Sequence, residues 1–142
     1  MNNVILVNGT FDIVHRGHID LLNCARGFGQ HLIVCIDSDR RVRELKGNSR
    51  PINNQEDRKH LLQNLKAVSA VYIFDSDKEL EKLCKQYSPI MVKGSDYKDK
   101  PIVGSQYCKE IKFLDLVNGY STTNTIQNII DRCLCSDLGR NK

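Results

Sequence analysis

The stretch that decides the fold is Asn8-Gly9-Thr10-Phe11-Asp12-Ile13-Val14-His15-Arg16-Gly17-His18. It follows the apolar run 4–7, which predicts a short buried strand, and it precedes residues 19–25, whose apolar spacing predicts a helix. Two histidines three residues apart therefore lie on one face where that helix begins. A helix N-terminus offers free N–H groups and partial positive charge, so this turn suits a phosphate.

Strand and helix signals alternate along the rest of the chain, which predicts an α/β fold with a parallel sheet. The expected strands cover residues 4–8, 31–36, 70–74, 90–92 and 111–116. The expected helices cover 17–26, 55–65 and 78–87, with a last helix from about 121, and 37–54 is interpreted as a polar stretch. Polar segments follow four of the strands, so we expect them to converge on the carboxyl edge of the sheet.

Apolar residues within the expected helices predict which sides face the core. We expect one helix to turn Leu61, Leu62 and Leu65 inward, and the last helix to have an apolar side made of Ile126, Ile129, Ile130 and Leu134. The length of 142 residues fits a single domain over 1–142, with 136–142 as a polar tail.

The composition is that of an ordinary soluble protein, with 40% hydrophobic and 27% charged residues. A net charge of +4 suits anionic substrates but is too weak to argue for nucleic-acid binding. No apolar run approaches the ~20 residues of a membrane span, and the N-terminus lacks the pattern of a signal peptide. We therefore expect a cytoplasmic protein with neither a membrane nor a nucleic acid as partner.

The six cysteines do not follow a metal-binding pattern. Cys24, Cys35 and Cys84 fall in apolar patterns, which predicts small buried hydrophobic side chains. His15, His18 and Cys24 could be drawn as a zinc site, but their spacing fits no standard ligand set. We therefore expect no protein-bound metal.

The opening stretch resembles the G-T-F-D-x-x-H-x-G-H signature of the cytidylyltransferase-like nucleotidyltransferases, with every specified position filled. Three later segments are similar to further motifs of that family: Leu45-Lys46-Gly47-Asn48-Ser49-Arg50-Pro51, Val92-Lys93-Gly94-Ser95-Asp96-Tyr97 and Gly119-Tyr120-Ser121-Thr122-Thr123. The resemblance spans nearly the whole chain. It implies a Rossmann-like parallel five-stranded sheet with helices on both faces.

The resemblance also implies a reaction, in which a sugar-phosphate oxygen attacks the α-phosphorus of a nucleoside triphosphate and pyrophosphate leaves. By the family's motif, His15 and His18 contact the phosphates and stabilise the transition state, and Lys46 bridges the two substrates. A magnesium ion would accompany the triphosphate, without a dedicated protein cage. The implied nucleotide-binding residues are Gly9, Thr10, Phe11, Lys93, Gly94, Asp96, Ser121, Thr122 and Thr123. The implied sugar-phosphate-binding residues are Asp12, Lys46 and Arg50.

Structural roles compete with some of these assignments. Taken alone, Asp12 is expected to cap or brace its turn, and Arg16 is expected to point into solvent or to pack on the loop. Ser121 to Thr123 taken alone predict a helix cap. Other phosphate-binding patterns fail, since the chain lacks G-x-x-x-x-G-K-[ST], and Gly27-Phe28-Gly29 follows an expected helix rather than a strand.

Within the family, the later segments most resemble the heptose 1-phosphate adenylyltransferases. This implies ATP and a heptose 1-phosphate as substrates, ADP-heptose as product, and a stand-alone transferase. The alternative is a glycerol-3-phosphate cytidylyltransferase that uses CTP; that group carries Arg where this chain has Leu116, and Leu cannot bond a cytosine edge. A non-catalytic nucleotide-binding module and a structural zinc protein are further alternatives. Relatives are often dimers, so a homodimer is an open expectation.

Overall fold

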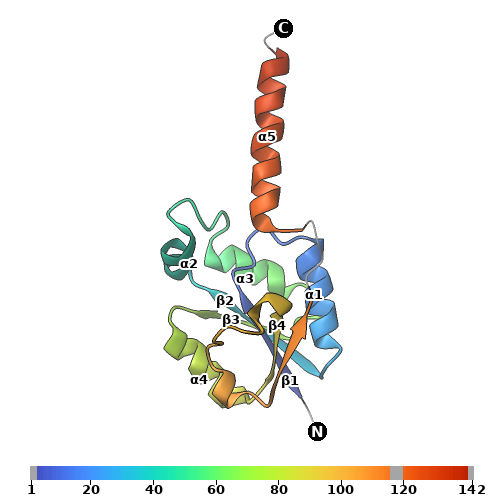
Figure 1. The fold of residues 1–142 in the computed structure, drawn as a ribbon, viewed down its shortest axis with the longest axis vertical. Coiled ribbons are helices and arrows are strands. Elements are labelled where there is room, and N and C mark those ends of the chain that lie inside the picture. Colours follow the sequence, from blue (N-terminus) through green and yellow to red (C-terminus); the bar gives the residue numbers. More distant parts are fainter. Residues whose placement is uncertain (1–2, 116–119, 141–142) are drawn as a thin grey trace.

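The computed structural model describes residues 3–115 and 120–140, which form an α/β fold with one five-stranded sheet (Figure 1). The strands are β1 (Val4–Gly9), β2 (His31–Asp37), β3 (Ala70–Phe74), β4 (Ile90–Gly94) and β5 (Glu110–Leu114). The helices are α1 (Arg16–Arg26), α2 (Asp39–Lys46), α3 (Gln55–Gln63), α4 (Asp77–Tyr87) and α5 (Thr122–Arg140), with short 3₁₀ turns η1 (Ser95–Tyr97) and η2 (Ser105–Tyr107).

The sheet is entirely parallel, in the order β3-β2-β1-β4-β5. The chain steps outward from β1 to β3 on one side, then returns to start β4 on the other side of β1. This confirms the expected Rossmann-like sheet, and it creates a switch point between β1 and β4, where parallel sheets bind ligands.

Helices cover both faces of the sheet, as expected. Alternate residues of β1 point to opposite faces. Ile5 and Val7 pack with Leu22 of α1 and Leu62 of α3, whereas Leu6 packs with Leu80 of α4. The three central strands β1, β2 and β4 are buried on both faces, which is why they read as continuous apolar runs in the sequence.

The largest difference from the sequence interpretation is α2, which lies inside the stretch that we read only as polar. Ser38 caps it by accepting a hydrogen bond from the backbone N–H of Arg41 at 3.2 Å, and Val42 is buried beneath it. Helix α2 thereby delivers Lys46 from its last turn.

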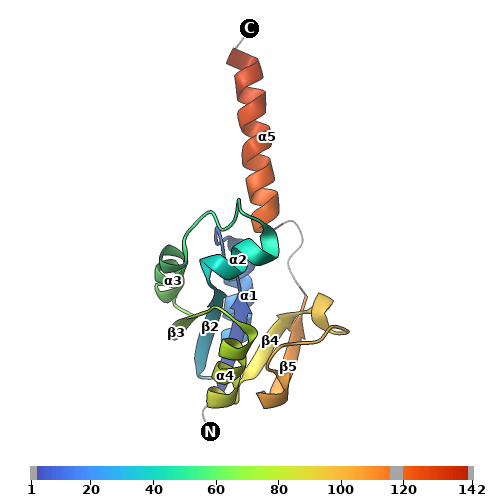
Figure 2. The same ribbon diagram turned by 90° about the vertical axis from the view of Figure 1, so that its left-hand side faces the viewer.

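Three burial predictions were wrong. Leu61 is 45% exposed, because α3 turns Arg58 and Leu62 inward, four residues apart. Cys24 is exposed on α1, whereas Cys35 and Cys84 are buried as expected. The apolar side of α5 is also uncovered, because the helix projects from the body (Figures 1 and 2). Helix α5 continues to Arg140 and so includes most of the segment expected as a polar tail.

Among the described residues, none of the helices is long and apolar enough to cross a membrane.

Candidate active site

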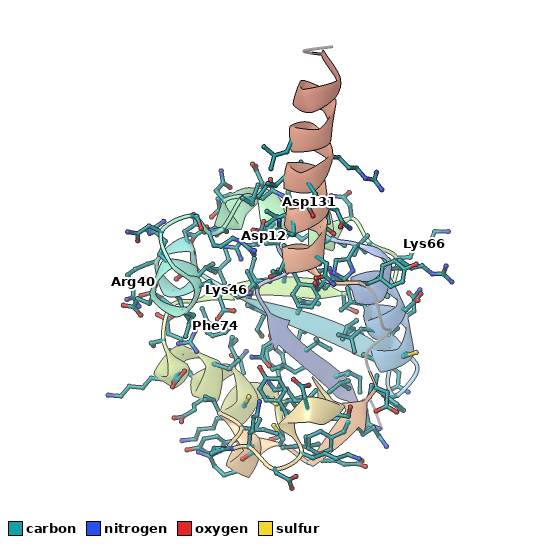
Figure 3. All side chains as sticks on the ribbon, turned by 45° about the horizontal axis from the view of Figure 1, so that its top comes forward. Asp12, Arg40, Lys46, Lys66, Phe74 and Asp131 are labelled. Carbon is teal, nitrogen blue, oxygen red and sulfur yellow. The ribbon has the colours of Figure 1, made fainter. Side chains whose placement is uncertain are left out.

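A cleft of about 560 Å³ opens at the carboxyl ends of β1, β2 and β4, where the switch point lies. Helix α1 contributes His18 to its wall, α2 contributes Lys46, and β4 contributes Lys93. Figure 3 shows Lys46 and Asp12 between the sheet and the base of α5, whereas Arg40 and Lys66 lie at opposite margins of the molecule. The predicted convergence of the polar segments on one edge is therefore seen in the structure.

The two histidines of the opening stretch cap α1 reciprocally. The Nδ1 atom of His15 accepts a hydrogen bond from the backbone N–H of Gly17 at 3.1 Å. The Nδ1 atom of His18 accepts one from the backbone N–H of His15 at 3.2 Å. Because Nδ1 is the acceptor in each ring, a neutral imidazole here carries its proton on Nε2. Both rings therefore offer an Nε2–H donor beyond the helix start.

The environment keeps both histidines neutral at pH 7. Burial, the neighbouring His15 and the charge of Lys46 together lower the pKa of His18 to about 4. Burial also lowers the pKa of His15. A neutral donor can bind a phosphate without a protonation step, so the pair suits charge that develops during a reaction.

Two lysines supply positive charge on the wall of the cleft. Lys46 is exposed at the end of α2, followed by Gly47 at a positive φ of 97°, which lets the chain turn away. Lys93 is half-buried at the end of β4, and burial lowers the pKa of its ammonium group. Its Nζ lies 4.9 Å from the ring centroid of Tyr97. The cleft thus favours anions at two separate positions.

Sequence reasoning missed two residues at the end of β2 and the start of α2. Asp37 is buried; its carboxylate accepts hydrogen bonds from Thr10 Oγ1 at 3.3 Å and from Arg41 Nε at 2.7 Å. Asp37 could have been predicted from the sequence, because it stands at the carboxyl end of a buried strand. Arg41 offered no signal beyond its charge. Together they fix the hydroxyl of Thr10 at the cleft.

Asn8, at the end of β1, also lines the cleft. Its side-chain oxygen is buried and has no hydrogen-bond partner in the described part of the protein. A buried unpaired carbonyl costs free energy unless a donor reaches it. This oxygen can therefore accept a hydrogen bond from a hydroxyl or amino group of a ligand, but not from a fully ionised phosphate, which has no proton to donate.

Asp12 braces a loop, as its structural interpretation predicted. One carboxylate oxygen accepts from the backbone N–H of Ile52 at 2.6 Å, and the other accepts from that of Asn53 at 2.9 Å. The side chain is buried and does not line the cleft. Its carboxylate is thus occupied by the 51–53 loop rather than free for a sugar phosphate.

The first turn of α5 meets this braced region. The hydroxyl of Thr122 donates a hydrogen bond to the backbone carbonyl of Asp12. Arg50 donates to the hydroxyl of Thr123 at 3.3 Å. Ser121 caps α5 by accepting from the backbone N–H of Asn124 at 2.9 Å. None of these residues is among those that line the cleft; Thr122 contacts Asp12, two residues beyond Thr10 of the lining.

Tyr120 connects the two regions. Its ring lies 6.1 Å from that of His15, and its Cβ lies within 3.0 Å of where a Cβ on Gly17 would stand. Gly17 is therefore required by close packing between the histidine pair and the residue before α5. Arg16 is exposed, as predicted, and pairs with Asp20 at 3.5 Å.

Arg58, a buried arginine that sequence reasoning also missed, makes hydrogen bonds to several of these segments. Arg58 donates to the carbonyls of Thr10 and Asp37, each at 2.8 Å, and to that of Asn53 at 3.0 Å. Its remaining terminal nitrogen donates to the Asp39 carboxylate at 2.9 Å. An arginine in an amphipathic helix reads as a surface residue, so periodicity could not reveal this role.

The structure sorts the predicted residues into two groups. Those that line the cleft are Gly9, Thr10, His18, Lys46, Lys93, Gly94 and Asp96. Those beside it are Asp12, His15, Arg50, Ser121, Thr122 and Thr123. Phe11 instead packs its side chain in the core, at a positive φ of 53°. Leu116 and Gly119 lie outside the described residues.

A cleft lined by lysine and histidine side chains at the switch point of a parallel sheet is typical of the nucleotide-handling α/β proteins. The model of the cytidylyltransferase-like family matches residues 6–128, and the chain belongs to this family. This confirms the resemblance that the motifs indicated.

Curated relatives share much of the sequence. The bifunctional protein HldE of Campylobacter fetus is 48% identical over 127 residues, which cover 89% of this chain and 28% of that protein. HldE of Campylobacter concisus is 46% identical over 128 residues, which cover 90% of this chain and 27% of that protein. The chain thus spans about a quarter of these relatives. A lipopolysaccharide core biosynthesis protein of Thermoplasma volcanium matches the fold, with a TM-score of 0.64 at 23% identity, over 85% of this chain and 100% of that one.

Proposed function

We propose that this protein transfers an adenylyl group from ATP to a heptose 1-phosphate, giving ADP-heptose and pyrophosphate. The observation that carries the reaction type is the reciprocal cap of His15 and His18, which presents two neutral donors at the edge of a basic cleft. The substrate choice is supported by the identity to HldE and by the likeness to the adenylyltransferase segments.

In this reaction a phosphate oxygen of the sugar phosphate attacks the α-phosphorus in line, one P–O bond forms, and the bond to pyrophosphate breaks. The attacking oxygen is already ionised, so no general base is needed. Negative charge shifts on the α-phosphate oxygens as the bond changes occur. The Nε2–H groups of His15 and His18 stabilise that charge from the start of α1.

The two substrates are both anions, and the protein must hold them together against their repulsion. Lys46 stands at the mouth of the cleft and bridges them, with Arg50 beside it. Lys93, Gly94 and Asp96 at the end of β4 hold the nucleoside side. Asn8 accepts a hydrogen bond from a hydroxyl or amino group of a substrate.

A magnesium ion is proposed to enter with ATP and to neutralise its phosphates. Within the residues that the structure describes, no group of three or more acidic, histidine or cysteine side chains is placed to hold a metal. The phosphate oxygens of ATP would therefore hold the ion.

Cytidylyl transfer to glycerol 3-phosphate is the second candidate, because the family that the chain belongs to is named for that chemistry. A panel of four nucleoside triphosphates crossed with heptose 1-phosphate and glycerol 3-phosphate separates the two, with pyrophosphate release as readout. Turnover with ATP and heptose 1-phosphate is expected. Turnover only with CTP and glycerol 3-phosphate would show that the substrates are wrong. Nucleotide binding without turnover on any acceptor would make the protein a binding module.

A matched pair of variants tests the histidine role. His18→Asn should lower kcat by a factor of about 100 or more, since a transition-state donor is removed. His31→Asn changes an exposed histidine at the amino end of β2, away from the cleft, and should leave kcat unchanged. Equal activity of both variants would contradict the proposed role of His18.

A further inference from the structure

Two cysteines that take no part in the candidate active site lie close together where α4 packs against η2. Cys84 of α4 is buried, Cys108 directly after η2 is half-buried, and both are free thiols. The Cys108 thiol donates a hydrogen bond to the backbone carbonyl of Gly104 at 3.4 Å. The Sγ atom of Cys84 lies 2.6 Å from where a Cβ on Gly104 would stand. Both sulfurs therefore lie against the same residue.

Gly104 places the two thiols directly behind one wall of the cleft. It has a positive φ of 82° and no room for a side chain, so only glycine lets this turn approach α4 so closely. The two residues before it, Ile102 and Val103, line the cleft and pack in the same core cluster as both cysteines. A covalent link between Cys84 and Cys108 would therefore hold this part of the wall to α4.

We propose that Cys84 and Cys108 are the site of a reversible disulfide, formed by exchange with a low-molecular-weight disulfide such as that of glutathione, which ties the cleft-lining segment 101–103 to α4.

The two thiols have the complementary properties that exchange requires. As hydrogen-bond donor, the Cys84 thiol lowers the pKa of Cys108, and the charge of Lys93 acts in the same direction, against burial. The same hydrogen bond, together with burial, raises the pKa of Cys84. Cys108 is therefore the half-exposed thiolate that reacts first, and Cys84 is the protonated partner beside it. Cys35, in the same core cluster, is inert by comparison, because burial raises its pKa to about 12.

The exchange proceeds in two steps. The Cys108 thiolate attacks one sulfur of glutathione disulfide, whose sulfur–sulfur bond breaks, and one glutathione leaves as a thiolate. Cys84 then gives its proton to water and attacks Cys108 Sγ, so that the protein disulfide forms and the second glutathione leaves as a thiolate. Two protein thiols are oxidised and one glutathione disulfide is reduced to two thiols. The reverse reaction restores the free cysteines, as in redox-sensing disulfides that form transiently in a reducing compartment.

The bridge would stabilise the hydrogen bonds of the turn around Gly104. The backbone N–H of Ser105 donates to the carbonyl of Ile102 at 3.3 Å, and that of Tyr107 donates to the carbonyl of Gly104 at 3.0 Å. Such amides exchange with solvent when the turn opens locally. A disulfide between α4 and Cys108 opposes that opening, so the exchange of these amides should slow.

Mass spectrometry of the full chain tests the pairing. The background chain replaces the other cysteines except Cys35, through Cys24→Ser, Cys133→Ser and Cys135→Ser. It is equilibrated with glutathione disulfide, and the remaining thiols are alkylated in denaturant. We expect alkylation at Cys35 alone and a pair of peptides joined through Cys84 and Cys108. Dithiothreitol should restore alkylation at all three positions.

Single variants in this background test the order of the steps. Cys84→Ala should stop at the mixed disulfide, with one glutathione on Cys108, whereas Cys108→Ser should bind no glutathione and form no bridge. Cys35→Ala is the matched control, since it removes a buried thiol of the same cluster and should bridge as the background chain does. Circular dichroism checks that each variant folds. A background chain that ends as the mixed disulfide, stays reduced or forms a bridge through Cys35 would overturn the proposal.

Hydrogen exchange tests the effect on the cleft wall without any substrate. In the bridged chain the amides of Ser105 and Tyr107 should exchange at least ~5-fold more slowly than in the reduced chain. Amides of α3, which packs on the other face of the sheet, are the control and should not change. Equal exchange of Ser105 and Tyr107 in the two states would show that the bridge does not hold this segment, and would overturn the proposal. Neither readout depends on turnover, so both stand apart from the proposed function.

Discussion

The rings of His15 and His18 stack with their centroids 3.9 Å apart, and each ring accepts a backbone N–H through Nδ1. The two hydrogen bonds fix both the orientation and the tautomer of the pair. Stacked rings so close together disfavour a double positive charge, which agrees with the lowered pKa of both. The pair therefore works as two neutral donors.

The first prediction concerns stability at low pH. The pKa of His18 is lowered to about 4, whereas a histidine in the unfolded chain titrates near 6.5. Between these values the unfolded chain binds more protons, so the free energy of unfolding falls as the pH drops from 6.5 toward 4. In His18→Asn this contribution disappears. The free energy of unfolding, measured in urea at several pH values, should therefore change less steeply with pH in this variant than in wild type.

His31→Asn serves as the control, since it removes an exposed histidine. Its free energy of unfolding should depend on pH as in wild type. If His18→Asn and wild type lose stability in parallel over this range, His18 is not held neutral by the fold.

The second prediction concerns Gly17. A Cβ at this position would lie 2.9 Å from Cε1 of His15 and 3.0 Å from Cβ of Tyr120. Gly17→Ala should therefore displace the His15 ring and lower kcat about 10- to 100-fold, with a much smaller loss of stability. The neighbouring exposed Arg16→Ala is the control and should keep full activity. Wild-type turnover by Gly17→Ala would show that the ring position is not required.

The third prediction separates a binding role from a structural one at Asn8. The unpaired oxygen of Asn8 stabilises nothing in the free protein, so Asn8→Ala should leave the free energy of unfolding unchanged or slightly raised. With substrates bound, the same change removes an acceptor and should raise the KM of one substrate. Steady-state kinetics with each substrate varied in turn identifies which one. Lost stability with unchanged KM would mean that the oxygen serves the fold.

The elements of the fold differ in how clearly the sequence predicts them. The strands were predicted to within about two residues. In β1, β2 and β4 the signal is a continuous apolar run, because these strands are buried on both faces. Helix α2 was missed because most of its residues are charged, and only Val42 is buried. It depends on its cap at Ser38 and on ion pairs such as Arg41 with Asp77 at 2.8 Å, which no periodicity reveals.

The site was predictable where residues act by their place in a motif, and less so where they act through tertiary contacts. His18 and Lys46 lie on the cleft as the motifs implied. The brace formed by Asp12 joins residues forty positions apart, so no local pattern gave its partner. Tyr120 contacts the start of α1 from far along the chain. Spacing also predicted the apolar side of α5, but not the exposure of Ile129, Ile130 and Leu134 on that side.

The last prediction concerns Arg58, which holds the ends of β1 and β2 to the 51–53 loop. Arg58→Met keeps much of the volume but leaves three backbone carbonyls and the Asp39 carboxylate without their donor. Removing one partner of a buried pair costs about 3–5 kcal/mol, so the free energy of unfolding in urea should fall by about that amount.

Arg40→Met is the matched control, because Arg40 also pairs with carboxylates, those of Asp75 and Glu44, but in solvent. Solvent screens such pairs, so its loss should be far smaller. If Arg58→Met folds, it should also show a raised KM, since Arg58 holds the carbonyl of Thr10, a residue that lines the cleft. Equal losses of stability in the two variants would mean that Arg58 acts as an ordinary surface charge, and that the hydrogen bonds of Asp12 to Ile52 and Asn53 hold the loop without it.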